Sequence, residues 1–237
     1  MYSNAKMQYM YQKSPIGLAA ASVIALCAAA CHMQRPAEER AAAAAVETTP
    51  VARTFVFECE DSYNFTARFS ENAVWLFLPT QAVQLPQVRS GSGAKYSGSG
   101  ITFWSKGRSA ILETADTSYF GCQNNPAKAI WEHARLNGVD FRATGNEPGW
   151  TLEITLDQDM VFTTHYGESS YRFLTPEPDI NPSVRETSYL VENADHQMSV
   201  RLKGQSCQDS VSGETVAVTV TIELDGARYA GCGKALR

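Results

Sequence analysis

The sequence predicts an all-β protein with two domains, and three observations support this prediction. Short alternating runs rich in Phe, Tyr, Trp, Thr and Val recur from Arg53 onwards, separated by Gly, Asn, Asp and Ser. A convincing helical pattern interrupts them at residues 125–138. The 237-residue chain is 44% hydrophobic and 19% charged, which is enough apolar material for a core. We therefore expect two β-rich domains joined by a short helix.

The first 30 residues have the composition of an export signal. They contain Lys6 and Lys13, no acidic residue, and the 15-residue apolar run "IGLAAASVIALCAAA" directly before Cys31. A membrane-spanning helix needs roughly 20 apolar residues, so a cleaved signal is favoured over a single-pass anchor. The closing "AAAC" resembles the lipobox of bacterial lipoproteins, with Ala28 where that family usually has Leu. The resemblance implies acylation of Cys31 and, with His32 next to it, anchoring in the outer membrane facing the periplasm.

Residues 31–53 are expected to form a flexible linker. The stretch "HMQRPAEERAAAAAVETTPVA" contains no aromatic residue and offers no apolar face for a helix to bury. Pro36 and Pro50 bracket its alanine run. Extended, such a segment reaches about 70 Å, which would hold a folded domain clear of a membrane.

Four cysteines remain for disulfides once Cys27 in the signal and the acylated Cys31 are set aside. Four cysteines allow three pairings. An exported protein meets an oxidising environment, and separate domains favour pairs within each domain. Zinc is the competing explanation, but the sequence has no CxxC or HxxxH spacing and its four histidines are scattered, so no metal or cofactor is expected. The expected disulfides are Cys59–Cys122 and Cys207–Cys232.

The first domain is expected at residues 54–125. Its predicted strands are "RTFVFEC", "NFTARF", "AVWLFL", "GITFWSK", "SAILET" and "SYFGC". The glycine- and serine-rich stretch that begins at Ser90, "SGSGAKYSGSG", is costly to order in a strand. We expect it to be an exposed loop that leads into "GITFWSK".

Charge is unevenly distributed along the chain. Residues 138–237 hold 8 basic and 15 acidic residues, and the chain without its signal holds 18 and 25. Nucleic acid is therefore a poor partner. The window between Glu71 and Glu113 has no carboxylate, and its cations form either an ordinary solvated face or a contact for an anionic cleft on another protein. These cations are Arg89, Lys95, Lys106 and Arg108.

The connecting helix is predicted at residues 126–137. Asn125 is placed as its N-cap, Pro126 as its first residue, and Gly138 follows its end. Residues at helical spacing form one apolar stripe, which predicts a buried face. The stripe consists of Ala127, Ile130, Trp131 and Ala134.

The second domain is expected at residues 138–237. Its predicted strands are "VDFRAT", "WTLEITL", "DMVFTTHY", "SYRFLT", "TSYLVE", "QMSVRLK", "TVAVTVTIEL" and "ARYAGCG". Alternation is cleanest in the seventh, where Val216, Val218, Val220, Ile222 and Leu224 share one face. In "GNEPGW", Glu147 and Trp150 fit either a sugar-stacking site or a turn before a buried tryptophan, and the turn is favoured.

The first domain resembles the membrane-bound inhibitors of C-type lysozyme. The motifs that carry the resemblance are "FECED", "LPQVRSGSGAKYSG", "WSKGRSAIL" and "YFGC". The resemblance implies a small antiparallel β-barrel whose serine-glycine loop and Trp-x-Lys-Gly turn enter the lysozyme cleft. The partner-binding residues it implies are Ser92, Lys106, Ser90, Gly93, Lys95, Tyr96, Trp104 and Gly107.

The chemistry of the target agrees with two of these residues. Lysozyme works with one protonated and one ionised carboxyl group, so a plug should offer a cation and a hydroxyl. Lys106 would supply the cation on a long stem, and Ser92 the hydroxyl. Tyr96 and Trp104 could instead brace the loops or lie in the core, and the core is favoured for both.

Catalysis is the rival class of function. The sequence has no GxSxG, HExxH or P-loop motif, and "GSGAKY" leads into a strand rather than a helix, so no enzyme activity is expected. A second rival is a non-inhibitory envelope protein that binds peptidoglycan or other glycans through the same loop. Residues 138–237 resemble a domain of uncharacterised bacterial lipoproteins, which implies no activity.

Overall fold

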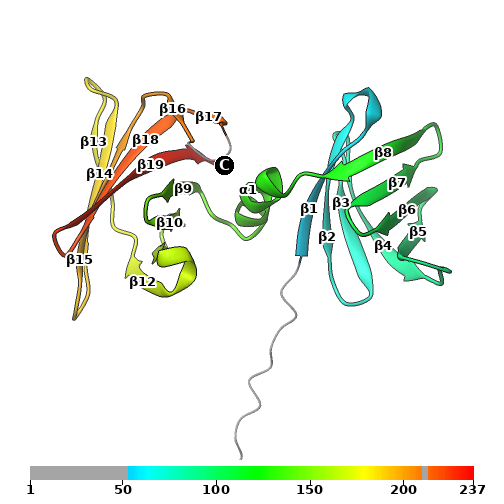
Figure 1. The fold of residues 1–237 in the computed structure, drawn as a ribbon, viewed down its shortest axis with the longest axis horizontal. Coiled ribbons are helices and arrows are strands. Elements are labelled where there is room, and N and C mark those ends of the chain that lie inside the picture. Colours follow the sequence, from blue (N-terminus) through cyan, green and yellow to red (C-terminus); the bar gives the residue numbers. More distant parts are fainter. Residues whose placement is uncertain (1–52, 210–212) are drawn as a thin grey trace, which may run out of the picture. The chain divides into compact units, whose positions relative to one another are not determined.

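The computed structural model describes residues 53–209 and 213–237, and within them the protein is all-β with one short α-helix (Figure 1). The predicted fold class is therefore confirmed. The expected export signal, the lipidation site Cys31 and the linker up to residue 52 lie outside the described residues.

The first β-rich part is a closed antiparallel barrel of eight strands in sequence order, with β1 paired to both β2 and β8. Because the barrel closes, it leaves no unpaired strand edge. A short 3₁₀ turn, η1 (Glu60–Ser62), follows the first strand. The strands are β1 (Arg53–Glu58), β2 (Asn64–Phe69), β3 (Ala73–Phe77), β4 (Ala82–Val88), β5 (Ala94–Gly98), β6 (Ile101–Lys106), β7 (Ser109–Glu113) and β8 (Ser118–Asn124).

The barrel interior is filled by inward-facing aromatic and aliphatic side chains. Phe103 is fully buried and meets Phe57 and Phe65 edge to face, with ring centroids 5.6 and 5.7 Å apart. Burying each such ring contributes about 2–3 kcal/mol. The disulfide Cys59–Cys122 joins the end of β1 to β8. Core and disulfide together hold the two ends of the barrel segment.

The helix α1 (Pro126–Leu136) begins as the sequence predicts, because the Asn125 side chain accepts a hydrogen bond from the Lys128 N–H. The predicted buried face is wrong in part. The helix buries Ala129 and Ala134, whereas Ala127 is exposed and Ile130 is 51% exposed. Its packing on β1 therefore uses a face of small side chains, which the apolar spacing alone does not single out.

The second β-rich part is a curved, nine-stranded antiparallel sheet with the order β12-β11-β10-β9-β19-β18-β15-β14-β13. A two-stranded ribbon of β16 (Cys207–Gln208) and β17 (Thr215–Val216) accompanies it. The sheet strands are β9 (Phe141–Asn146), β10 (Gly149–Ile154), β11 (Asp159–Thr164), β12 (Ser169–Leu174), β13 (Asp179–Asn181), β14 (Glu186–Glu192), β15 (Gln197–Lys203), β18 (Val218–Leu224) and β19 (Ala227–Ala235).

One face of this sheet carries a second hydrophobic core. It includes Leu152, Phe162, Met198 and Ile222, all fully buried or nearly so. The disulfide Cys207–Cys232 joins β16 to β19, and both disulfides are the pairs that the sequence predicts. Trp150 is buried in this core, as the favoured interpretation of "GNEPGW" requires.

The strand predictions need correction, because β4, β5, β13 and β16 have no predicted counterpart and one predicted strand is divided. The stretch predicted as one exposed loop from Ser90 contains strand β5, and strand β4 precedes it. Strands β4 and β5 pair only after Pro86, through Gln87 with Tyr96 and Val88 with Lys95. The glycine, serine and proline residues around these pairs are unusual in strands, so the sequence pattern does not indicate this part of the barrel. The run predicted from Thr215 to Leu224 is divided between β17 and β18.

Candidate functional site

The loop between β4 and β5 is organised by a serine. The Ser90 hydroxyl donates to the Ser92 carbonyl oxygen at 2.5 Å and accepts from the Ser92 backbone N–H at 3.2 Å. These two contacts close a tight turn around Gly91. The Ser92 side chain is exposed at the tip of this turn, next to Gly93 in the left-handed region at φ 67°.

Trp104 on β6 ties this loop to the neighbouring hairpin. Its indole N–H donates to the Ser92 carbonyl oxygen at 2.8 Å, and the ring is 39% exposed. The favoured core position for Trp104 is therefore wrong, because Trp104 alternates with the buried Phe103 and faces outward. The residue braces the loop from outside the barrel.

Gly93 brings the backbones of the two loops into contact. A Cβ at Gly93 would lie 2.3 Å from the Ser105 carbonyl oxygen and 3.1 Å from Lys106 Cβ. Only glycine permits this approach, and its positive φ requires glycine for a second reason. The stems of Ser92 and Lys106 are therefore held next to each other, although the two residues belong to different loops.

Lys106 ends β6 at a two-residue turn, where Gly107 has φ 61°. The lysine side chain is exposed, and so are Arg89 and Arg108. Within the residues that the structure describes, neither Lys106 nor the other cations of this window, including Lys95, form a salt bridge. Lys106 is thus a cation without a carboxylate of its own in the described chain.

The remaining residues of the predicted set lie nearby but differ in role. Lys95 is half-buried on β5, directly opposite Trp104. Tyr96 is 4% exposed and belongs to the barrel core, the position favoured for it, and burial raises the pKa of its hydroxyl. Tyr96 therefore supports the loops from inside rather than meeting a partner.

An apolar hollow of about 350 Å³ opens beneath the two loops. Phe55, Phe57, Phe69 and Tyr96 line it, and Gly93 and Gly107 lie at its margin. Sequence reasoning missed this hollow, because the alternation of β1 and β2 marks their aromatic residues only as core.

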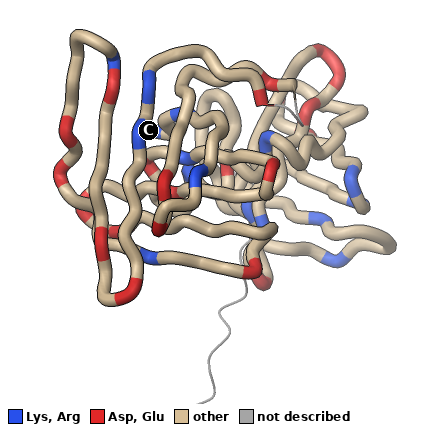
Figure 2. The backbone as a smooth tube through the Cα atoms, turned by 60° about the vertical axis from the view of Figure 1, so that its left-hand side comes forward, with Lys and Arg blue, Asp and Glu red and all other residues tan. Residues whose placement is uncertain are grey.

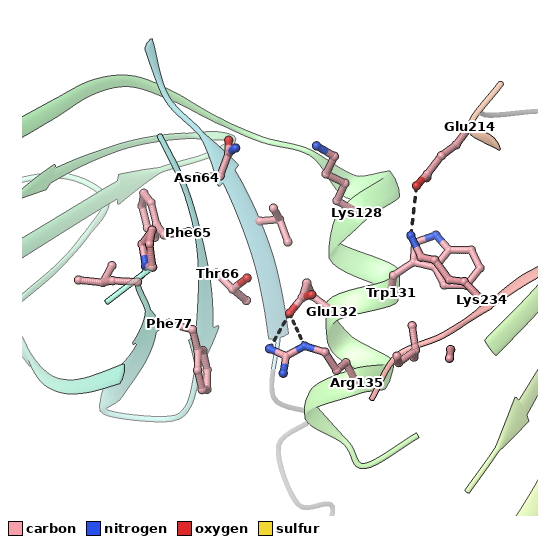
Figure 3. A pocket seen from close by; sticks show the side chains of 15 residues that line it. Asn64, Phe65, Thr66, Phe77, Lys128, Trp131, Glu132, Arg135, Glu214 and Lys234 are labelled. Carbon is pink, nitrogen blue, oxygen red and sulfur yellow. Dashed lines mark hydrogen bonds and ion pairs between the residues drawn. The ribbon is translucent and has the colours of Figure 1, made fainter. Parts of the chain in front are cut away.

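A larger hollow of about 520 Å³ runs along α1 and is drawn in Figure 3. Its charged groups are already paired: Lys234 with Glu214 at 3.1 Å, and Arg135 with Glu132 at 2.8 Å. Lys234 also lies 4.7 Å from the centre of the Trp131 ring. These contacts satisfy one another, so this hollow shows no group that requires a ligand.

Other site classes find no support in the described part of the chain. It contains no group of three or more His, Cys, Asp or Glu side chains placed to hold a metal ion. No helix between residue 53 and the C-terminus, outside residues 210–212, is long and apolar enough to cross a membrane.

The barrel presents an exposed serine side chain, Ser92, and a lysine without a salt bridge among the described residues, Lys106, from neighbouring loops. Residues 57–120 match the family model described as membrane-bound lysozyme-inhibitor of c-type lysozyme. The resemblance seen in the sequence motifs is confirmed for this segment.

A curated relative agrees with the family match. The membrane-bound lysozyme inhibitor of C-type lysozyme from Yersinia enterocolitica serotype O:8 / biotype 1B is 51% identical over 43 residues. The alignment covers 18% of this chain, and the chain spans 37% of the relative's length. No solved structure matches the chain. The family match ends before α1, so it says nothing about residues 138–237.

Proposed function

We propose that the barrel inhibits a C-type lysozyme by placing Ser92 and Lys106 in its active-site cleft. The observation that carries the proposal is the contact between the two loops at Gly93, which brings the backbone next to Ser92 against the end of strand β6 that carries Lys106. The family match at residues 57–120 and the relative's name support the target.

The chemistry follows from the two carboxyl groups of a lysozyme. The ionised carboxylate would accept charge-assisted hydrogen bonds from the Lys106 ammonium group. The protonated carboxyl would exchange a hydrogen bond with the Ser92 hydroxyl. Because no carboxylate lies between Glu71 and Glu113 in the sequence, this end of the barrel adds little repulsion against an acidic cleft.

The neighbouring residues take supporting roles in this proposal. Ser90 and Trp104 hold the Ser92 carbonyl from two sides, and Gly93 and Gly107 supply the turns. Lys95 would lie at the rim of the contact. Such pre-organisation reduces the ordering cost of binding.

The proposal includes the domain order and location that the sequence predicts. Residues 1–30 would be removed, Cys31 acylated and residues 31–53 left as a linker. The barrel at 54–125 and the second domain at 138–237 would then face the periplasm from the outer membrane. A Cys31→Ser variant should leave the membrane fraction of fractionated cells, whereas unchanged membrane association would contradict the anchor.

The decisive experiment titrates residues 53–237 into a C-type lysozyme during cell-wall lysis. This part contains both hydrophobic cores and both disulfides, so it is expected to fold alone. Wild type should inhibit at a one-to-one ratio, and Lys106→Ala should weaken binding about 30-fold, equal to about 2 kcal/mol. Arg108→Ala is the matched control, because it removes the same charge two residues away. Equal losses in both variants, or no inhibition by wild type, would refute the proposal.

A further inference from the structure

The outer face of the second sheet carries a row of unused hydroxyl groups. Thr144, Thr151 and Thr163 lie directly opposite one another on β9, β10 and β11. They alternate with core residues and so point away from the core, where each is half-buried. Among the described residues, none of these three hydroxyls takes part in a hydrogen bond.

An exposed aromatic ring stands at one end of this row. Tyr166, in the 3₁₀ turn η2 (His165–Gly167), is 87% exposed. One edge of its ring lies against Gly149, since a Cβ at that glycine would be only 2.4 Å from a ring carbon. The Tyr166 hydroxyl donates to the Asn146 carbonyl oxygen at 3.4 Å. The ring is therefore held in solvent rather than free to fold away.

The backbone that presents this ring is strained. His165 and Tyr166 both have positive φ, 51° and 57°, and Gly167 follows at 103°. A left-handed residue other than glycine costs roughly 1–2 kcal/mol. Here two consecutive residues other than glycine are left-handed, and the ring that they present is not buried. Backbone strain of this kind is common at ligand-binding sites.

The threonine row and Tyr166 line one pocket of about 480 Å³, within the usual range for small-molecule sites. Trp131 and Ile130 of α1 and Arg142 of β9 also line it. The Arg142 guanidinium pairs with Glu153 and lies 5.8 Å from the centre of the Trp131 ring, but its buried Nε has no hydrogen-bond partner in the described structure. Trp150 lines the pocket as well, and its buried indole N–H also has no hydrogen-bond partner in the described structure. The pocket thus combines three aromatic side chains, three threonine hydroxyls and two buried donors without a partner.

We propose that this pocket binds a neutral pyranose oligosaccharide. A sugar ring has an apolar face that stacks on an aromatic side chain and a rim of hydroxyls that both donate and accept. Tyr166 would provide the stacking platform, and the threonine hydroxyls would pair with the rim. The excess of acidic residues in 138–237, 15 against 8 basic, disfavours an anionic polysaccharide at the same place (charged residues are coloured in Figure 2).

This site differs from the sugar site that "GNEPGW" suggests. Trp150 is 4% exposed in the core, so it is not available for stacking. The motif acts through its glycine instead, because Gly149 leaves the space in which the Tyr166 ring lies. The proposal does not depend on lysozyme inhibition, since it uses a different domain and a different ligand.

The test measures binding of chitotetraose and cellotetraose to the full chain by titration calorimetry, with no lysozyme present. Wild type should bind at least one of them. Tyr166→Asn should weaken binding about tenfold, because asparagine tolerates the left-handed backbone and removes only the ring. Tyr166→Phe keeps the ring and should bind like wild type. Thr151→Val keeps the shape, removes one central hydroxyl and should weaken binding several-fold.

Two controls accompany this test, a substitution outside the pocket and an anionic polysaccharide. Leu174→Ala removes an apolar side chain that is 84% exposed and does not line the pocket, so it should change nothing. Dextran sulfate tests the charge argument and should not bind at this pocket. The proposal fails if wild type binds neither oligosaccharide, if only dextran sulfate binds, or if Tyr166→Asn and Thr151→Val bind like wild type.

Discussion

Three glycines in the β4–β5 loop and the β6–β7 turn allow steric clash to be separated from backbone strain. Gly91 has open space around a would-be Cβ and no positive φ. Gly107 has open space but φ 61°. Gly93 has φ 67° and a would-be Cβ only 2.3 Å from the Ser105 carbonyl oxygen. Alanine therefore adds neither penalty at Gly91, backbone strain alone at Gly107, and both strain and a steric clash at Gly93.

The structure sets the order of the expected losses in unfolding free energy. Gly91→Ala should be neutral or about 0.5 kcal/mol more stable, because it restricts only the unfolded chain. Gly107→Ala should lose about 1 kcal/mol from its left-handed backbone. Gly93→Ala adds an overpacking cost, and the obstructing atom belongs to a backbone that cannot rotate away. Its total loss should be roughly 3 kcal/mol.

Urea unfolding with the disulfides intact, followed by lysozyme titration, tests this order. Gly93→Ala should inhibit worst, since relief of the clash moves the Ser92 loop away from Lys106. Gly91→Ala should inhibit like wild type. If Gly93→Ala matched Gly91→Ala in both stability and inhibition, the two loops would not be in contact, and the reasoning for a joined site would be refuted.

Three further outcomes are expected. Trp104→Phe should keep the unfolding free energy within about 0.5 kcal/mol but weaken lysozyme binding several-fold, since one exposed hydrogen bond is lost. Hydrogen bonds from Lys128, and then Asn125, lower the pKa of Glu58. The stabilisation that ionised Glu58 gives the folded state is therefore present above the ordinary carboxyl pKa and is lost as pH falls through the lowered value. In urea unfolding from pH 2 to 7, the midpoint of Glu58→Gln should therefore fall less at acidic pH than the midpoint of the wild type. Replacing Cys207 and Cys232 by serine should destabilise the nine-stranded sheet by about 3 kcal/mol and leave the barrel's melting unchanged.

The fold class was accessible from the sequence because its signals are local. Alternation in "NFTARF" or "QMSVRLK" records which side chains face a core, and Asn125 with Pro126 marks a helix start. Strands β4 and β5 were missed because their evidence is not local. Their residues include proline, glycine and serine, and only pairing across the barrel makes them strands.

The site was accessible in part. Motif resemblance predicts Ser92 and Lys106 as site residues, which stays a prediction, but no sequence signal showed that Ser90 and Trp104 both hold the Ser92 carbonyl. No sequence pattern predicts the pocket beside Tyr166. Its threonines are seven or more residues apart and meet only through strand register, and a tyrosine with positive φ leaves no trace in hydropathy.

The strand register explains why the β4–β5 loop and the β6–β7 turn depend on the barrel core. Phe103 faces inward and Trp104 outward, and β5 pairs Lys95 with Trp104 and Ala94 with Ser105. A slip of one residue would exchange the two faces, bury Trp104 and remove its hydrogen bond to the loop. The fully buried Phe103 prevents this slip, because exposing its ring would cost about 2–3 kcal/mol. The geometry at Gly93 is therefore specified from inside the barrel, and core substitutions around Phe103 should reduce inhibition without touching the loops.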